Sequence, residues 1–136
     1  MISNGIVSER KRMRELLRRW GMCGDMCREK SRRLKEFKSL SGDAEPSEQY
    51  LSTVEALNRG CQADFAFGRA MTELVNQLSP RLQTVLWMRY ASNSSFLRVA
   101  LRLNCSADHA KRLERQAVDA LIAMPGYEEL QKELCS

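Results

Sequence analysis

Several features that define common classes of protein are missing from this chain of 136 residues. No apolar run is long enough for a signal peptide or a membrane span, and the mean hydropathy of −0.44 excludes a membrane protein. No alternation typical of β-strands and no hairpin turn signal occurs. The length fits one compact domain and a little more, which argues against a two-domain metabolic enzyme. We expect an all-α protein of the cytoplasm that makes no contact with a membrane.

Signatures of catalysis are missing as well. The sequence contains no phosphate-binding glycine loop, paired-acid motif or zinc signature. His109 is the single histidine, and no local motif places a serine, cysteine or carboxylate beside it, so a position facing a groove or solvent is favoured over a general-base role. We therefore expect no enzyme activity and no cofactor.

The five cysteines do not form a disulfide framework, because their number is odd and no secretory start precedes them. Cys23 and Cys27 would lie one helical turn apart, as two metal ligands can. The other candidate ligands stand at spacings that do not complete a zinc site; they are Cys61, Cys105, Cys135 and His109. Small core residues with reduced thiols are the favoured interpretation, and no metal is expected.

Acidic residues are the minority among the charged side chains. Lys and Arg number 22 against 17 acids, which gives a net charge of +5, and 16 of the 22 are Arg. The guanidinium group forms a planar fork that pairs with phosphates and with guanine edges. This balance makes double-stranded DNA the first partner to consider.

The charge is unevenly distributed along the chain. Residues 1–38 carry 12 basic and 5 acidic side chains, for +7, and residues 39–78 carry 2 and 6, for −4. Residues 79–124 carry 7 and 3, for +4, and residues 125–136 carry 1 and 3, for −2. Two basic segments thus flank an acidic one, which concerns local fields and partners rather than the fold.

Residues 7–38 have the pattern of one long basic helix. Gly21 and Gly24 either weaken its middle or let another backbone approach closely. Turn formers between Lys38 and Pro46 predict a loop. One helix face is marked by a stripe of residues that recur at alternating steps of three and four. They are Met13, Leu16, Trp20, Cys23, Cys27, Lys30, Leu34 and Phe37, and Leu17 widens the stripe. This spacing predicts packing against the second helix or against its copy in a dimer.

A second long helix, or a helix pair divided at Gly60, is expected from Pro46 or Ser47 to Leu78. Its stripe consists of Val54, Leu57, Cys61, Phe65, Gly68, Met71, Val75 and Leu78. We expect four segments: residues 1–45 as basic helix and loop, 46–78 as connecting helix or helix pair, 79–124 as a DNA-binding domain, and 125–136 as an acidic tail.

Residues 79–124 read as a helix-turn-helix. Ser79 and Pro80 are a helix start, with the serine hydroxyl as the cap, and that helix ends near Ala91. A short helix capped by Ser94 or Ser95 follows, then the turn Asn104-Cys105-Ser106, then a longer helix ended by Pro125-Gly126. The inward positions are Leu82, Val85, Leu86, Tyr90, Phe96, Val99, Ala100, Leu103, Ala110, Leu113, Ala117, Leu121 and Met124.

In such a unit the second helix enters the major groove and reads base edges with its first residues. The outward positions of the segment 106–123 would be Ala107, Asp108, His109, Lys111, Arg112 and Arg115, after the cap Ser106. Lys111, Arg112 and Arg115 supply charge for phosphate or guanine contacts. Asp108 either accepts from cytosine or favours the helix N-terminus. Arg98 and Arg102 would lie near the DNA backbone.

Residues 79–121 resemble the region of sigma-70 family factors that recognises the upstream promoter element. The matching features are an L-[ST]-P-R opening, Val85-Leu86 with Arg89-Tyr90, Val99-Ala100 with Leu103, then Ser106, Lys111 and a closing A-[VL]-x-A-L. The whole plan resembles small phage regulators of the ArpU and RinA type, whose basic N-terminal helix has an L-L-x-x-[YW] block, here Leu16 to Trp20. The resemblance implies a transcription regulator of late phage or prophage genes in a bacterial host cell, with RNA polymerase as a further candidate partner.

Several alternatives stay open at the level of sequence. The basic helix 7–38 is a solvated face, a second DNA contact, or a surface for a partner protein or a homodimer. Trp20 and Trp87 anchor the core, unless Trp87 is exposed and marks a partner surface. The domain itself is either a DNA reader, a module that binds RNA polymerase or another regulator without base contacts, or a small terminase-like packaging protein.

Overall fold

A computed structural model describes residues 4–40 and 47–135, and the side chains of residues 5–40 and 47–132. The model is 89% helical, with six α-helices and no strand among the residues described. The all-α prediction is confirmed. Residues 41–46, which belong to the loop expected between Lys38 and Pro46, lie outside the described part of the chain.

The first two helices are long and continuous. Helix α1 spans Asn4–Leu40 and α2 spans Glu48–Asn76. The hydroxyl oxygen of Ser47 accepts a hydrogen bond from the amide of Tyr50 at 3.1 Å, which is an N-cap for α2. Gly60 lies inside α2 and does not divide it, so the connecting segment is one helix and not a helix pair.

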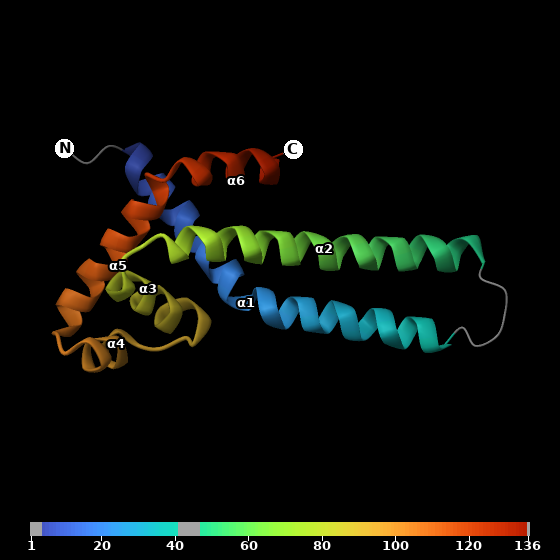
Figure 1. Cartoon of the computed structure of the whole chain (residues 1–136), viewed down its shortest axis with the longest axis horizontal. Helices are drawn as coiled ribbons and strands as arrows, with labels where there is room; N and C mark the ends of the chain where they lie inside the picture. The colour runs from blue at the N-terminus through green and yellow to red at the C-terminus, as the bar shows by residue number, and fades with distance from the viewer. Residues whose placement is uncertain (1–3, 41–46, 136) are drawn as a thin grey trace. The chain divides into compact units, whose positions relative to one another are not determined.

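The rest of the chain is a succession of shorter helices (Figure 1), namely α3 (Pro80–Leu86), a π-helical turn η1 (Trp87–Ala91), α4 (Phe96–Leu103), α5 (Ala107–Ile122) and α6 (Pro125–Cys135). The hydroxyl of Ser79 makes no capping bond, so that expectation was wrong, and the start of α3 rests on Pro80. Most of the acidic tail forms α6, a helix that was not predicted from the sequence.

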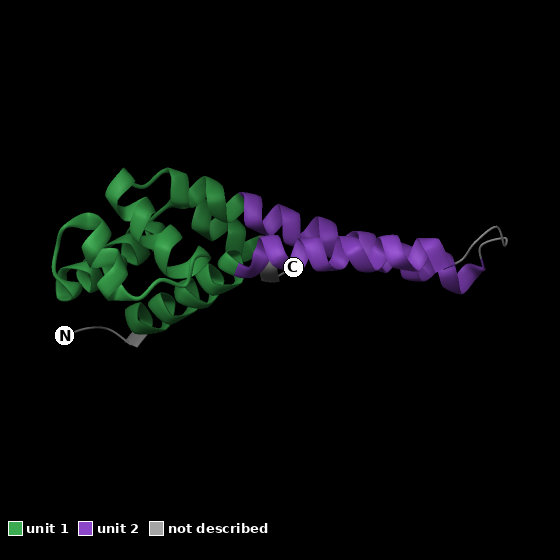
Figure 2. Cartoon of the chain, turned by 90° about the horizontal axis from the view of Figure 1, so that it is seen from below, with its two compact units in different colours: residues 1–21, 70–136 green, residues 22–69 purple. Residues whose placement is uncertain are grey.

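The chain divides into two compact units, which are coloured separately in Figure 2. Unit 1 consists of residues 1–21 and 70–136, and unit 2 of residues 22–69. The first part of α1 therefore belongs to the same unit as α3 to α6.

Unit 1 has a continuous apolar core. Helix α5 packs against both α3 and α4. Tyr127 and Leu130 of α6 are buried as well. The largest fully buried side chains are Met13, Leu17, Met71, Val75, Val85, Leu86, Val99, Val118 and Leu121. The first part of α1 thus supplies core residues to the same unit as the helix-turn-helix.

Close backbone packing fixes α1 within unit 1 at Gly21. A Cβ atom on Gly21 would overlap the carbonyl oxygen of Tyr90 and lie 2.6 Å from its carbonyl carbon. Beside it, the ring of Trp20 is buried, meets the ring of Trp87 edge-on at a centroid distance of 4.6 Å, and donates through Nε1 to the hydroxyl of Thr72 at 3.0 Å. Gly21 was predicted either to weaken the helix or to let another backbone approach closely, and the structure shows the close approach.

Unit 2 pairs the second part of α1 with the first part of α2. The rings of Phe37 and Tyr50 stack at 5.1 Å, and Cys23 Sγ donates to the carbonyl oxygen of Asp64 at 2.7 Å. Lys30 Nζ lies 2.6 Å from Oδ2 of the buried Asp64, an ion pair without good hydrogen-bond geometry. The stripe of α1 thus packs on α2 of the same chain, which was one of its two predicted partners.

One stripe position in α2 was predicted wrongly. Phe65 was expected to face inward, but its side chain is 65% exposed, whereas Phe67 is buried. The buried position nearest to Phe65 is Asp64, which meets Lys30, so an ion pair displaces an aromatic residue from the inner face.

No helix in the described residues is long and apolar enough to cross a bilayer.

Candidate nucleic-acid interface

The turn between α4 and α5 has the geometry that the sequence predicts. Asn104 adopts the left-handed conformation, with φ 55° and ψ 50°, and ends α4. The hydroxyl of Ser106 accepts from the amide of His109 at 3.0 Å and caps α5. Ser95, not Ser94, caps α4 by accepting from the amide of Arg98 at 3.2 Å. Two capped helices joined by a three-residue turn form a helix-turn-helix.

The predicted recognition residues occupy the first half of α5 in the expected manner. Asp108, Lys111, Arg112 and Arg115 are exposed, and Ala107 and His109 are partly exposed. The inward set Ala110, Leu113, Ala117 and Leu121 is buried. The hydroxyl of Ser106 is engaged in the cap. On α4, Arg98 and Arg102 are both exposed. The amphipathic character of α5 therefore turns its basic side chains outward together.

One buried carboxylate joins α5 to α1. Arg14 donates through Nε and Nη2 to the two carboxylate oxygens of Glu114 at 3.0 and 3.2 Å, and the Tyr90 hydroxyl donates to Oε1 at 3.0 Å. Glu114 is 5% exposed, so its charge needs these partners. Burial, together with the neighbouring Glu114 carboxylate, raises the pKa of Tyr90 to about 12. The phenol stays protonated at neutral pH and keeps its role as donor.

A second pair of the same kind lies along the same two helices. Arg10 donates through Nε and Nη2 to Asp119 at 2.7 and 2.9 Å. Both pairs are bidentate, the geometry in which arginine and a carboxylate hold each other in a fixed orientation. The hydrogen bonds from Arg10 and Arg14 keep the pKa of each guanidinium raised, against the opposing effect of burial. Two arginines of the basic N-terminal segment thus attach α1 to α5.

The outer side of this junction is an open pocket of about 400 Å³, which we call the basic pocket. Its lining is Arg14, Arg18, Arg89, Tyr90, Phe96, Lys111, Arg112, Glu114 and Arg115. The guanidinium carbon of Arg89 lies 4.0 Å from the centre of the Phe96 ring, and Lys111 Nζ lies 5.9 Å from it. Arg89 also donates to the carbonyl oxygen of Ser94 at 2.9 Å, whereas its buried Nε has no hydrogen-bond partner among the described atoms.

Lys111, Arg112 and Arg115 of this pocket were predicted as functional residues from the sequence, whereas Arg14, Arg18 and Glu114 were not. A signal for Glu114 was present, since it stands between the inward residues Leu113 and Ala117, where a carboxylate requires a cation. No signal indicated that the cation would be Arg14, which is 100 positions away along the chain.

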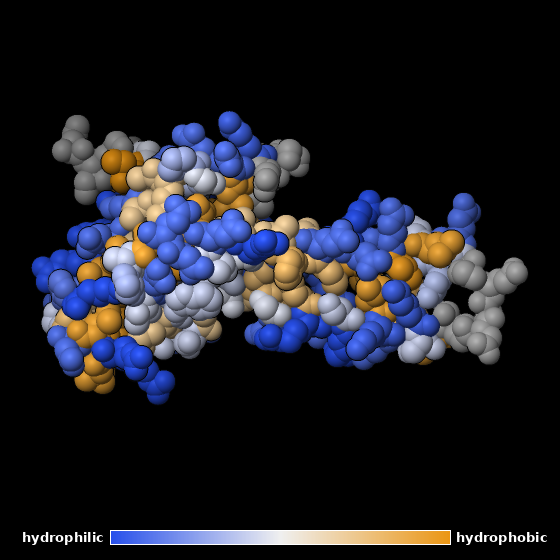
Figure 3. Space-filling view, viewed as in Figure 1, coloured by the Kyte–Doolittle hydropathy of each residue, from blue (hydrophilic) through white to orange (hydrophobic). Residues whose placement is uncertain are grey.

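Apolar side chains are exposed near the helix-turn-helix. Leu97 and Leu101 on α4 are 64% and 70% exposed, and Trp87 is 42% exposed. Figure 3 shows an apolar patch on the surface where Figure 1 labels α4. A separate shallow pocket is lined by Pro80, Gln83, Thr84, Trp87, Met88 and Arg102. Trp87 thus both contacts the core residue Trp20 and reaches the surface.

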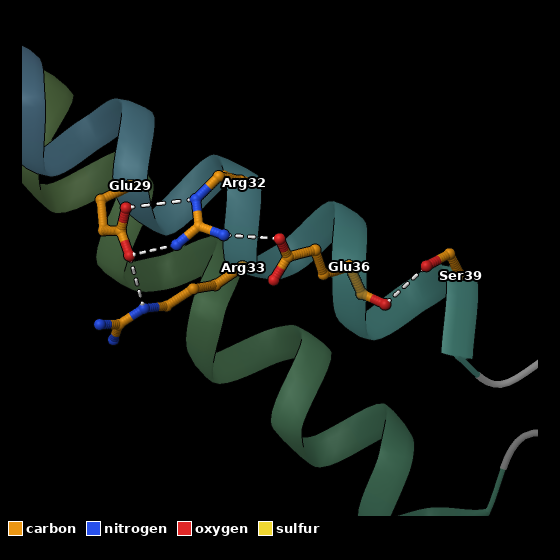
Figure 4. A network of polar contacts seen from close by, with 5 residues as sticks. All are labelled: Glu29, Arg32, Arg33, Glu36 and Ser39. Carbon is orange, nitrogen blue, oxygen red and sulfur yellow. Dashed lines mark hydrogen bonds and ion pairs between the residues drawn. The ribbon is translucent and has the colours of Figure 1, made fainter.

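The basic residues in the second part of α1 are arranged differently. Arg32 bridges Glu29 and Glu36 on its own helix, at 2.7 and 2.5 Å, and Arg33 lies 3.2 Å from Glu29 (Figure 4). Arg28 pairs with Asp25 one turn away. The hydrogen bond from Arg32 is the main cause that lowers the pKa of Glu29. These cations are therefore matched by carboxylates of the same exposed helix.

The fold and the exposed basic face of α5 place this chain in the class of DNA-binding helix-turn-helix proteins. Residues 74–122 match the family model described as Sigma-70, region 4, which covers 49 of the 136 residues. The helix-turn-helix of this chain is therefore sigma-like. Comparison with curated proteins and with solved structures found no match. Among the described residues, no group of three or more metal-ligating side chains lies close together.

Proposed function

We propose that this protein is a sequence-specific regulator of transcription that reads the major groove of double-stranded DNA with the first half of α5. The observation that carries the proposal is the capped α4–turn–α5 unit, whose exposed residues include Lys111, Arg112 and Arg115. The match to the Sigma-70, region 4 model over these residues supports it. In this proposal Ala107, Asp108 and His109 approach base edges, and Arg98 and Arg102 lie near the phosphates.

The experiment begins with selection of bound fragments from a random duplex library, followed by affinity measurements at two or more salt concentrations. The double variant Lys111→Gln/Arg112→Gln is compared with the control Lys35→Gln/Arg59→Gln, which removes the same charge from exposed positions of unit 2. Because each phosphate contact contributes a salt slope of roughly 0.9, the test variant loses at most about 1.8 units of slope, together with its sequence preference. Unchanged affinity for the selected sequence would contradict the assignment of α5 as the recognition helix.

The biological setting belongs to the proposal as well. The resemblance of the whole plan to phage regulators leads us to propose a role in the control of late phage or prophage genes, without enzyme activity. A gene position ahead of packaging or lysis genes supports this role, and a position among unrelated chromosomal genes argues against it.

A protein-binding role for the same domain is favoured by one observation, the exposed Leu97 and Leu101 on α4 with Trp87 nearby in sequence. Exposed leucines at positions i and i+4 form one helix face suited to a protein partner. RNA polymerase or a second copy of the chain is the proposed partner. Native mass spectrometry separates a dimer from a packaging ring, and pull-down of purified RNA polymerase by the wild type but not by Leu97→Ser/Leu101→Ser tests the first partner.

A further inference from the structure

The basic pocket gathers cations from α1, η1 and α5. We propose that it binds a phosphate group and that Arg18, from the N-terminal helix α1, is one of the ligands. If the phosphate belongs to DNA, this role deepens the proposed function and rests on it. Arg18 lies outside the stretch that matches the sigma-like model.

The charge balance of the pocket carries the argument. Its lining contains six cations and one carboxylate, that of Glu114. This carboxylate is already occupied by Arg14 and by the Tyr90 hydroxyl. The remaining five cations are Arg18, Arg89, Lys111, Arg112 and Arg115, and no ion pair with a carboxylate is found for them among the described residues. Five like charges around one pocket favour an anion there.

The chemistry of the ligands indicates which anion. Four of the five unmatched cations are arginines, whose forked donors fit two oxygens of a phosphate at once. Arg89 is further held by Phe96 and by the carbonyl oxygen of Ser94, so its guanidinium has a defined position. A phosphate group offers several oxygens to cations from different directions, as this pocket requires.

Arg18 is placed by contacts on both sides of it along α1. Arg10 and Arg14 hold α1 to α5 by bidentate ion pairs, and Gly21 packs on the backbone of Tyr90. The helix cannot easily move away from α5 between these points. An arginine on such a fixed helix loses less freedom on binding than one on a flexible arm.

The position of the pocket connects it with DNA. Lys111 and Arg112 belong both to the predicted base-reading surface and to the lining of the pocket. Phosphates of both strands border the major groove, which is about 12 Å wide. A duplex that receives the first half of α5 therefore brings backbone phosphates to the side of the helix where the pocket lies. A free phosphate-bearing molecule has the same chemistry and is the other source to be tested.

The first arm of the experiment measures binding of a random-sequence duplex from 0.1 to 1 M salt. Arg18→Gln is compared with Arg12→Gln, which removes the same charge from an exposed position of α1 that does not line the pocket. One phosphate contact contributes roughly 0.9 to the slope of log affinity against log salt concentration. Loss of that contact in Arg18→Gln should therefore reduce the change in affinity between 0.1 and 1 M salt about eight-fold, whereas Arg12→Gln should have little effect. Arg18→Lys keeps the charge and retains most of the slope.

The second arm titrates inorganic phosphate into the ¹⁵N-labelled protein and follows the side-chain Nε signals of Arg18 and Arg89. Saturable shifts in the wild type that are lost at Arg89 in Arg18→Gln support a phosphate site. Thermal unfolding by circular dichroism confirms that Arg18→Gln is folded, as expected for an exposed residue.

The outcomes separate the two proposals. A reduced slope for Arg18→Gln on DNA supports the site with DNA as the source. Phosphate-dependent shifts without any change in DNA binding support the site and assign it to a free phosphate compound. A wild type that binds no duplex but shows these shifts refutes the proposed function and not the site. Unchanged slope together with no saturable shift overturns the inference.

Discussion

The two parts of α1 have similar composition and use their charge in different ways. In unit 1, Arg10 and Arg14 pair with Asp119 and Glu114, which lie 109 and 100 residues away along the chain. In unit 2, Arg28, Arg32 and Arg33 pair with acids one turn away on the same exposed helix, whereas Lys30 pairs with the buried Asp64 of α2.

This difference shows what a net charge of +7 for residues 1–38 conceals. A charge count does not distinguish cations that join helices from cations that are matched locally or that face solvent. The structure shows a use of this helix that the sequence did not predict, since Arg10 and Arg14 join its first part to α5. Arg28, Arg32 and Arg33 of the second part match the solvated face that was one of the predicted alternatives. Arg18, in the first part, is the residue to which we assign a phosphate.

The largest expected effect concerns the two glycines of α1. A Cβ on Gly21 overlaps backbone atoms of Tyr90, which cannot move aside as a flexible side chain does, whereas a Cβ on Gly24 meets only the end of the Arg28 side chain at 3.7 Å. Gly21→Ala should lower the free energy of unfolding by about 3 kcal/mol, because overpacking against backbone forces the helices apart. Gly24→Ala should raise it by up to about 1 kcal/mol through helix propensity. Urea unfolding measures both, and equal effects at the two sites would refute the distinction.

The second prediction compares two ion pairs of α1. Arg14→Gln leaves the buried Glu114 with a hydrogen bond from the Tyr90 hydroxyl and without its cation, and should cost about 2 kcal/mol. This is less than for a fully buried pair, because the Arg14 side chain is 31% exposed. Arg28→Gln removes an exposed pair on the same helix and should leave the midpoint of urea unfolding unchanged. A loss for Arg28→Gln as large as for Arg14→Gln would remove the contrast between the two parts.

The contrast also explains how far the sequence could predict this molecule. The helix-turn-helix was predictable because its signals are local: Asn104 at a left-handed position, Ser106 at a cap, and apolar residues at helical spacing. The basic pocket was not, because its lining combines Arg14 and Arg18 of α1 with residues from Arg89 to Arg115, far along the chain. Phe65 was misassigned since its stripe position competes with Asp64, whose partner Lys30 lies on another helix. Side-chain pairing between distant helices leaves no periodic trace.

The third prediction tests the Tyr90–Glu114 contact through pH. The folded pKa of Tyr90, about 12, lies above the ordinary value of 10, so the folded state holds its proton more tightly than the unfolded state. The corresponding stability is fully present below pH 10 and is lost as the pH rises toward 12. We expect a decrease of about 1–2 kcal/mol in the free energy of unfolding between pH 9.5 and 11.5 from this group. Tyr90→Phe should have a flatter profile over that interval, and identical profiles would show that Tyr90 is not the source.

The smallest effect is expected in the exposed network of Glu29, Arg32 and Glu36. Arg32 is the main cause of the lowered pKa of Glu29, so Arg32→Gln should return that pKa toward its ordinary value without a measurable change in the urea midpoint. The sign follows from linkage: a carboxylate with a lowered folded pKa stabilises the fold above its unfolded pKa, and this contribution fades as the pH falls. Titration of the Glu29 side-chain carbon by NMR measures the shift.

Because the network is exposed, 1 M salt should have the same effect on Glu29 as the substitution, whereas the buried Glu114 pair should resist salt. Equal salt sensitivity of the two sites would mean that both parts of α1 carry their charge in the same solvated manner.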